Sequence, residues 1–183
     1  MLKKSNSGKM VAAMQRRSFA LGLSASFGLA GCSHGKTLGY DGPAVTSIVV
    51  NKSARKMYLL NNDEILRTYR VDLGFAPSGH KRIQGDGRTP EGTYIIDRRN
   101  PQSNFHLSLG ISYPNARDRA NARAMGKRPG GDIFIHGQPN NNKDRKRAAR
   151  VEDWTAGCIA VTNEEMEEIY SMVRTGTVIA LRP

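Results

Sequence analysis

The chain contains only two cysteines, Cys32 and Cys158, and this limits how its fold can be stabilised. Cys32 lies at the end of a basic and apolar leader, where we expect it to carry a lipid. If it does, no intramolecular disulfide can form. A hydrophobic core must then hold the fold, and a chain of 183 residues, 38% of them hydrophobic, is long enough to bury one as a single domain.

Residues 1–31 have the features of an export signal. An apolar run of small residues at 19–30 contains no acidic residue, and five basic residues precede it: Lys3, Lys4, Lys9, Arg16 and Arg17. The run is shorter than the roughly 20 apolar residues that a membrane-spanning helix needs, so we interpret it as the core of a signal peptide. The pair Arg16-Arg17, followed by Ser18-Phe19, resembles a twin-arginine signal.

The end of this leader, Leu29-Ala30-Gly31-Cys32, resembles a bacterial lipobox, in which the signal peptidase cuts before a lipidated cysteine. We therefore expect residues 1–31 to be removed and residues 32–44 to form a lipidated, glycine-containing tether. An ordinary signal peptide is the alternative, because small residues precede most cleavage sites. Either way, we expect export to the cell envelope or periplasm, and with a lipidated Cys32 we also expect attachment to a membrane.

The chain stays basic after removal of the leader. The leader holds five of the 28 basic residues and none of the 16 acidic ones, so 23 basic and 16 acidic residues remain. This excess favours an anionic partner. Because exported chains rarely meet nucleic acid, we do not expect that partner, and we expect peptidoglycan peptides, anionic wall polymers or lipid headgroups instead.

From residue 45 onward the sequence is a series of short β-type segments. The predicted strands are 47–50, 56–60, 65–73, 93–96, 107–112, 132–136 and 177–181. The polar turn Asn61-Asn62-Asp63-Glu64 predicts a hairpin between the second and third of these. The predicted fold class is therefore mainly β.

One helix is well specified, because Thr162 and Glu165 match a capping box and four apolar residues follow on one face: Met166, Ile169, Tyr170 and Val173. Residues 114–131 and 138–150 are strongly polar and show neither helix nor strand periodicity. We predict that both are long loops. Loops of this length inside a compact domain usually have a functional role and are not merely solvated surface.

Cys158 is a candidate nucleophile, because a single free thiol in an oxidising compartment needs a reason. It lies just before the predicted helix, whose positive N-terminal potential should favour the thiolate modestly. His136 follows the apolar strand 133–135, so we expect it at a sheet edge. A cysteine nucleophile needs such an imidazole to take up its proton and pass it to the leaving group. The alternatives are a buried hydrophobic cysteine and a structural histidine.

Three runs together resemble the catalytic domain of the YkuD-type L,D-transpeptidase family: Gly85-Asp86-Gly87-Arg88-Thr89-Pro90-Glu91-Gly92-Thr93-Tyr94, Ile135-His136-Gly137 and Thr155-Ala156-Gly157-Cys158-Ile159. The resemblance makes residues 45–183 the catalytic domain and implies a β-sandwich with short helices. It also implies that Cys158 is the nucleophile, that His136 is the general acid and base, and that backbone N–H groups at Gly157 and Cys158 stabilise the oxyanion. It requires no metal and no cofactor.

The same resemblance implies a substrate. The Cys158 thiolate attacks the carbonyl of the third residue of a peptidoglycan stem tetrapeptide, terminal D-alanine leaves, and an amine of a second stem peptide takes the acyl group from the thioester. Four residues are expected to contact substrate: Thr155, Gly137, Arg88 and His106. For Arg88 we favour the interpretation that it has a structural role in the glycine-rich turn. His80 is a further candidate for lining the cleft.

The chain also departs from typical members, which carry Ser-His-Gly-Cys-Ile-Arg where this chain has Ala156 and Ala160. That arginine is expected to meet a substrate carboxylate, so we expect Arg88 or a cation of the basic segments to replace it. A smaller branch with this change includes hydrolases that cut wall-to-lipoprotein links. An endopeptidase or amidase acting on peptidoglycan, or on its links to an outer-membrane lipoprotein, is therefore the first alternative.

A non-catalytic lipoprotein that binds peptidoglycan is the second alternative. The pairing of His136 with Cys158 argues against this alternative, because a protein that only binds peptidoglycan does not need an exposed thiol. A cysteine protease would share these two residues but should lack the glycine-rich run at 85–94.

Overall fold

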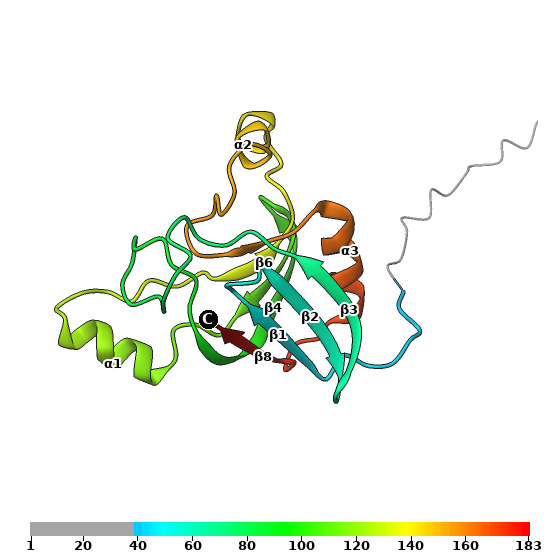
Figure 1. Ribbon diagram of the computed structural model, residues 1–183, viewed down its shortest axis with the longest axis horizontal. Helices are drawn as coiled ribbons and strands as arrows, with labels where there is room; N and C mark the ends of the chain where they lie inside the picture. The colour runs from blue at the N-terminus through cyan, green and yellow to red at the C-terminus, as the bar shows by residue number, and fades with distance from the viewer. Residues whose placement is uncertain (1–38) are drawn as a thin grey trace, which may run out of the picture. The chain divides into compact units, whose positions relative to one another are not determined.

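The structure, a computed structural model, describes residues 39–183 (Figure 1). The predicted signal peptide, Cys32 and most of the predicted tether lie outside these residues and stay predictions. Tyr40, within the described part of the tether, packs partly buried against the core. Within the described part of the chain, no helix is both long enough and apolar enough to cross a membrane.

Eight strands form one mixed sheet. β1 (Ser47–Asn51) lies between β2 (Lys56–Asn61), which is antiparallel to it, and β8 (Val178–Arg182), which is parallel. β3 (Glu64–Arg70) pairs antiparallel with β2, which confirms the predicted hairpin. The strand order is β3-β2-β1-β8-β4-β5-β6-β7, with β4 (Gly92–Ser103), β5 (His106–Ile111), β6 (Phe134–His136) and β7 (Ile159–Ala160).

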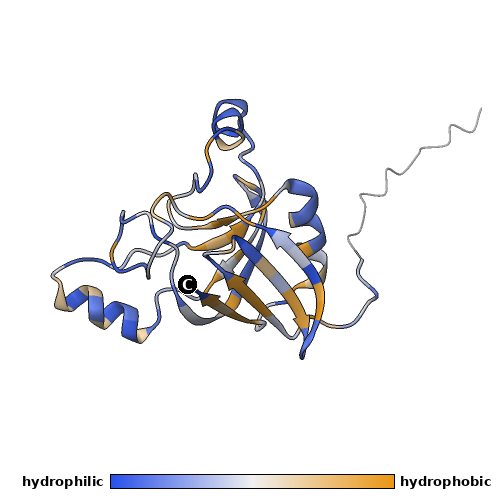
Figure 2. Cartoon of the chain, viewed as in Figure 1, coloured by the Kyte–Doolittle hydropathy of each residue, from blue (hydrophilic) through white to orange (hydrophobic). Residues whose placement is uncertain are grey.

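The sheet curls until its two edges meet. The first part of the long strand β4 pairs with β8, and its later part pairs with β5. Beyond β3, the backbones of Asp72 and Ala160 exchange hydrogen bonds of 2.9 and 2.8 Å, so the chain after one edge strand meets the other. The enclosed core is aliphatic, as the orange strands of Figure 2 show, and includes Ile48, Leu59, Ile96, Leu109, Ile135 and Ile159. The mainly β prediction is confirmed.

Helix α3 (Asn163–Met172) confirms the helix predicted from the capping box. The Thr162 hydroxyl accepts a hydrogen bond from the Glu165 N–H at 3.2 Å, and the Glu165 carboxylate accepts one from the Thr162 N–H at 2.9 Å. Met166 and Ile169 are buried where α3 packs against β5 and β6. The helix thereby anchors the chain that leaves β7, a few residues after Cys158.

The prediction of loops at 114–131 and 138–150 is wrong, because each segment contains a helix. Both helices are hydrophilic (Figure 2) and stand away from the sheet in Figure 1, so they have no apolar stripe that periodicity could reveal. Their signal is an asparagine cap, Asn115 in one and Asn141 in the other, that accepts a hydrogen bond from a backbone N–H three residues on. The helices are α1 (Ala116–Ala124) and α2 (Asn142–Ala148).

Two predicted strands differ from the observed ones at their ends. β4 continues to Ser103, past the predicted end at 96. Its later residues are polar and so lack the apolar alternation of a predicted strand, but they still pair with β5. β3 ends at Arg70, before the predicted end at 73, because the chain leaves β2 there to join β7.

A buried lysine ties the sheet to the glycine-rich run at 85–94. Lys52 follows β1 and its side chain is only 2% exposed. Its ammonium donates to the carbonyls of Gly79 at 2.6 Å and Thr89 at 3.0 Å, and to the Glu91 carboxylate at 2.8 Å. Burial lowers the pKa of Lys52, which the ion pair with Glu91 opposes. Because all three protons are used, the buried charge is compensated.

Replacing Lys52 by methionine should lower the free energy of unfolding by about 3 kcal/mol, because Glu91 and two carbonyls lose their partner. Urea unfolding measures this. Arg70→Gln is the matched control, since the side chains of the Arg70–Glu152 pair are 70% and 60% exposed and their pairing should contribute less than about 1 kcal/mol. Equally small effects of both substitutions would show that the Lys52 charge does not hold the run.

Candidate functional site

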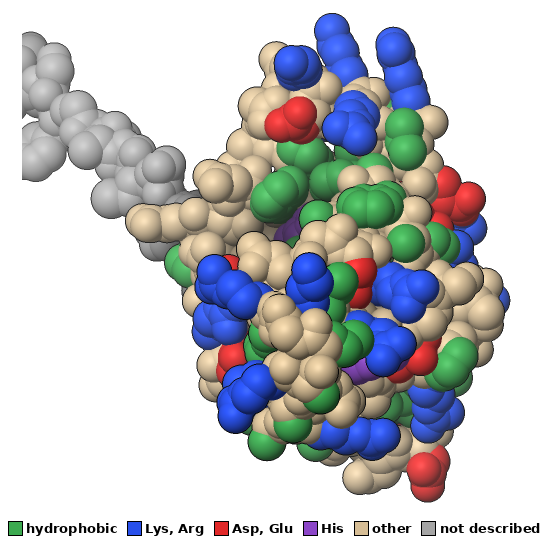
Figure 3. Space-filling view, turned by 90° about the vertical axis from the view of Figure 1, so that its left-hand side faces the viewer, with side chains coloured by type: hydrophobic (Ala, Val, Ile, Leu, Met, Phe, Trp, Pro, Cys, Tyr) green, Lys and Arg blue, Asp and Glu red, His purple; other side chains and the backbone are tan. Residues whose placement is uncertain are grey.

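Cys158 and His136 line one cavity of about 290 Å³. His136 ends β6, Cys158 directly precedes β7, and these two strands are parallel neighbours. The sheet therefore brings together two residues that are far apart in the sequence. Figure 3 shows hydrophobic side chains around a hollow in which a histidine is visible. The cavity is also lined by Asn100, Ser103, Asn104, Phe105, Ser108, Asp132 and Phe134.

One hydrogen bond selects the tautomer of His136. Its Nδ1 lies 2.7 Å from the carbonyl oxygen of Gly137, which can only accept, so Nδ1 carries the proton. Nε2 is then the nitrogen that can take up a proton. The rings of Phe105 and Trp154 lie beside the imidazole, at centroid distances of 4.5 and 5.7 Å. Burial lowers the pKa of His136 to about 4, against the Gly137 hydrogen bond, so the imidazole is neutral at pH 7.

The Cys158 thiol is also neutral at pH 7. It is partly buried and donates to the Asp132 carbonyl at 3.4 Å. Burial raises the pKa of Cys158 to about 11, although the Phe134 backbone and the Lys81 ammonium act in the opposite direction. The modest shift toward thiolate that the sequence predicted is outweighed, because α3 begins only at Asn163. The resting pair is a thiol and a neutral base.

Gly157 positions the thiol through close backbone packing. Its φ is +134°, and a Cβ atom there would lie 2.6 Å from the carbonyl oxygen of Arg88. Gly74 packs in the same way, since a Cβ atom on it would lie 2.1 Å from the carbonyl oxygen of Gly87 and 2.9 Å from the Cα of Gly157. The glycine-rich run therefore supports the segment that precedes Cys158, and only residues without a side chain fit this contact.

Asp86 holds the shape of that run. Its carboxylate accepts hydrogen bonds from the Lys81 ammonium at 2.9 Å and from three backbone N–H groups, those of Arg82, Ile83 and Arg88. Burial acts to raise the pKa of Asp86, but these hydrogen bonds lower it below its ordinary value. The charged carboxylate is thus the centre of a fixed turn.

Thr155, predicted to bind substrate, is buried and organises the nucleophile segment. Its hydroxyl donates to the Cys158 carbonyl at 2.8 Å and accepts from the Gly157 N–H at 3.1 Å. The Gly157 N–H, one of the two predicted oxyanion donors, is therefore occupied. No hydrogen bond joins the Cys158 N–H to another described residue, so this second donor is available.

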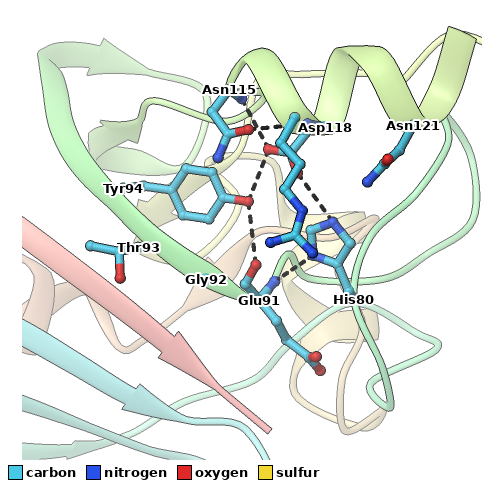
Figure 4. A pocket seen from close by; sticks show the side chains of 9 residues that line it. His80, Glu91, Gly92, Thr93, Tyr94, Asn115, Asp118 and Asn121 are labelled. Atoms are coloured by element: carbon cyan, nitrogen blue, oxygen red, sulfur yellow. Dashed lines mark hydrogen bonds and ion pairs between the residues drawn. The ribbon is translucent and has the colours of Figure 1, made fainter.

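Arg88, His106 and His80 do not line the cavity that holds Cys158. Arg88 contributes its carbonyl to the contact with Gly157, and His106 Nε2 lies 2.8 Å from the Glu167 carboxylate on α3. His80 lines a different cavity of about 410 Å³ (Figure 4). Substrate contacts of these three side chains stay a prediction. Gly137, in contrast, contributes at the site by orienting His136.

Sequence reasoning did not single out the other residues that line the cavity, nor Trp154 beside His136. Asp132 has φ +54°, which is uncommon for a residue other than glycine, and it follows two glycines; that pair before a strand was an available signal. Phe105 and Trp154 carried no such signal, because they meet His136 only after β4, β5 and β6 have paired.

The sequence is similar to one protein family over most of its length. The family model of the YkuD L,D-transpeptidase catalytic domain matches residues 46–181. A curated relative, "Putative L,D-transpeptidase YafK" of Escherichia coli strain K12, is 30% identical over 122 residues. The match covers 66% of this chain and 42% of YafK, so the chain spans about two fifths of the length of that relative.

Solved structures show the same architecture. The helical cell shape determining protein Pgp2 of Campylobacter jejuni is 27% identical, with a TM-score of 0.56 over 78% of this chain and 49% of Pgp2. An L,D-transpeptidase from Mycobacterium smegmatis is 15% identical, with a TM-score of 0.50 over 76% of this chain and 59% of that protein. At that identity the second comparison supports the fold alone.

The raised pKa of Cys158 predicts slow alkylation of the resting protein. Iodoacetamide reacts with the thiolate, and at pH 7 a pKa of about 11 leaves about 100-fold less thiolate than the ordinary value of 9.0. The rate at pH 7 should be about 10- to 100-fold below that of free cysteine and should rise with pH up to about 11. His136→Gln should change it little. Fast alkylation with an inflection between pH 6 and 8 would indicate a thiolate–imidazolium pair instead.

Gly157→Ala should displace the nucleophile segment, because the new Cβ atom would overlap the Arg88 carbonyl. We expect the free energy of unfolding to fall by about 2 to 4 kcal/mol. Gly126→Ala is the control, since its φ is +65° but no atom lies within 4 Å, and it should cost about 1 kcal/mol. Equal losses in chemical denaturation would argue that the close contact does not position Cys158.

Proposed function

The chain belongs to the YkuD L,D-transpeptidase catalytic domain family, and we propose that it is a peptidoglycan L,D-transpeptidase with Cys158 as its nucleophile. One observation carries the proposal: Cys158 and His136 line the same cavity, and His136 is held in the tautomer whose Nε2 can take up the thiol proton. The substrate class follows from the family, whose substrates are peptidoglycan peptides.

In the first half-reaction, Nε2 of His136 takes the proton of the Cys158 thiol while the sulfur attacks the carbonyl of the third stem residue. The oxyanion that forms accepts a hydrogen bond from the Cys158 N–H, which has no other partner among the described residues. The bond to terminal D-alanine then breaks, the leaving amine takes the proton from His136, and a thioester remains. Because its pKa is about 4, His136 is neutral at pH 7, so its Nε2 holds no proton before this step.

In the second half-reaction, an amine of another stem peptide attacks the thioester. The new carbon–nitrogen bond forms, the carbon–sulfur bond breaks, and a proton of the amine passes through His136 to the sulfur. Water in place of the amine gives hydrolysis and a free carboxylate. The outcome therefore depends on whether the site holds an amine close to the thioester.

Ala160 favours hydrolysis as a second candidate function. Typical members have an arginine at this position, whereas Ala160 is 2% exposed and its backbone is bonded to Asp72 where the sheet edges meet. No cation reaches the substrate from here, and a peptide acceptor that relies on such a cation is held less strongly. The second candidate is thus an endopeptidase or amidase acting on peptidoglycan or on its links to a lipoprotein.

Export and lipid attachment at Cys32 are part of the proposal, because the predicted substrate lies outside the cytoplasm and the leader has the required pattern. The positive charge of the surface supports this proposal, because it suits an anionic environment. Exposed Lys143, Lys146 and Arg147 lie on α2, which stands away from the sheet, and Lys and Arg side chains project at the top of Figure 3. Such a surface suits anionic wall polymers or lipid headgroups.

Mass spectrometry of defined substrates tests the function. Tetrapeptide muropeptides, and separately lipoprotein-linked muropeptides, are incubated with the protein, with Cys158→Ala and with His136→Gln. We expect cross-linked products that vanish in Cys158→Ala and fall at least about 100-fold in His136→Gln. Trimmed or released products without cross-links would establish hydrolysis. If neither substrate gives a Cys158-dependent product, the protein is a binding module.

A further inference from the structure

A second cavity, of about 460 Å³, adjoins the one that holds Cys158. Asp132 lines both cavities and is the residue that they share among those described. The second cavity is formed mainly by the segment 128–132, together with Gln84, Arg98, Tyr113 and Pro114. Its volume is ample for one amino acid residue with its side chain. A ligand held there would lie on the far side of Asp132 from the apolar cavity.

Asp132 contacts the thiol through its backbone and carries an exposed carboxylate. Its backbone carbonyl accepts the Cys158 hydrogen bond, and its side chain is 91% exposed. One oxygen lies 3.3 Å from the Arg98 guanidinium, which is itself bound by both oxygens of Asp97 at 3.0 Å. Asp132 therefore keeps most of its capacity to accept hydrogen bonds, and an ammonium group would find a partner next to the nucleophile.

Arg128 supplies the opposite charge to the same cavity. The segment that carries it is fixed, because the Arg128 carbonyl accepts the Gln84 N–H at 2.8 Å and the Pro129 carbonyl accepts the Tyr113 hydroxyl at 3.0 Å. The Arg128 side chain is exposed, and its guanidinium has no ion-pair or hydrogen-bond partner within residues 39–183. It is thus free to bind a carboxylate.

The other large polar cavity, of about 410 Å³, is lined by no exposed carboxylate like that of Asp132. Its buried carboxylate, Asp118, already accepts hydrogen bonds from the Tyr94 hydroxyl and the Asn115 N–H, both at 2.9 Å, and lies 3.2 Å from His80 (Figure 4). The His80 Nδ1 in turn accepts the Glu91 N–H at 2.9 Å. This network joins α1 to the start of β4, so we assign it a structural role.

We propose, resting on the function proposed above, that the cavity at Asp132 binds the amino acid on the amine side of the reacting bond, with its amino group beside Asp132 and its α-carboxylate on Arg128. During acylation this residue is the terminal D-alanine: its carbon–nitrogen bond breaks, and the amine that has received the proton of His136 departs beside Asp132. During transfer an acceptor amine with a neighbouring carboxylate enters the same place.

This placement explains how the chain manages without the arginine that typical members carry at the position of Ala160. The sequence predicted that Arg88 or a cation of the basic segments would replace it. Arg88 does not line either of the two cavities that meet at Asp132, whereas Arg128, from the basic segment 114–131, lines one of them. The substrate carboxylate then binds to a residue of the loop before β6 and not to a residue of β7.

The test compares a stem tetrapeptide that ends in a free carboxylate with the same peptide ending in a carboxamide. Release of D-alanine and of D-alaninamide is measured by mass spectrometry as kcat/KM. We expect the unaltered protein to prefer the free acid by about 10-fold or more, since a charge-assisted hydrogen bond is lost with the amide. Arg128→Gln should bring this ratio close to 1. Lys127→Gln, the matched control on the neighbouring exposed cation, should keep it.

The amine half is tested by inhibition with free D-alanine. Asp132→Asn should weaken this inhibition about 10-fold, while inhibition by D-lactate, which lacks the amine, should change little. Asparagine is a suitable replacement because it tolerates the positive φ of this position. Unchanged inhibition by D-alanine in Asp132→Asn would overturn the assignment of the amine.

The outcomes separate this inference from the function on which it rests. If Arg128→Gln keeps the preference for the free acid while release still requires Cys158, the inference is overturned and the proposed function stands. If the unaltered protein releases D-alanine from neither peptide, both are overturned. Loss of the preference in Lys127→Gln as well would show general charge attraction instead of a built site, and would also overturn the inference.

Discussion

The place of the Cys158 thiol depends on close packing between three backbone segments, at Gly74, Gly87 and Gly157. These contacts leave no room for a Cβ atom, so they locate the nucleophile segment more tightly than side-chain packing could. Charged groups also hold the run, because Asp86 accepts hydrogen bonds within it and the buried Lys52 donates to Thr89 and Glu91. The glycine-rich run is thus a structural part of the site, although its side chains do not line the cavity.

Burial has a second consequence, because it keeps both reacting groups neutral. The pKa of Cys158 is raised to about 11 and that of His136 is lowered to about 4, so between these values the resting pair holds one proton on sulfur. Attack on a carbonyl and transfer of that proton are then coupled. A protonated thiol is also less easily oxidised than a thiolate, which suits the proposed export of Cys158, the only cysteine of the described residues, to an oxidising compartment.

Local patterns predicted the elements that bury an apolar face. The β2–β3 hairpin and α3 were found from alternation, a polar turn and a capping box, all of which are short-range signals. α1 and α2 were missed because they bury little, and the later part of β4 was missed because it is polar and its pairing partner, β5, follows a turn. Cys158 and His136 were singled out because their residue types, together with neighbouring glycines, indicate one chemistry, and both line the same cavity.

The sequence by itself determined the family of the chain and its candidate reactive groups. A lone thiol, a histidine after an apolar strand and a glycine-rich run are local features that can be recognised without the structure. Only the tertiary structure decided that the Gly137 carbonyl selects the tautomer of His136, that Thr155 occupies the Gly157 N–H, and that Asp132 joins two cavities. These properties depend on distances between strands that are remote in the chain and on the degree to which each group is buried, and no local pattern encodes either.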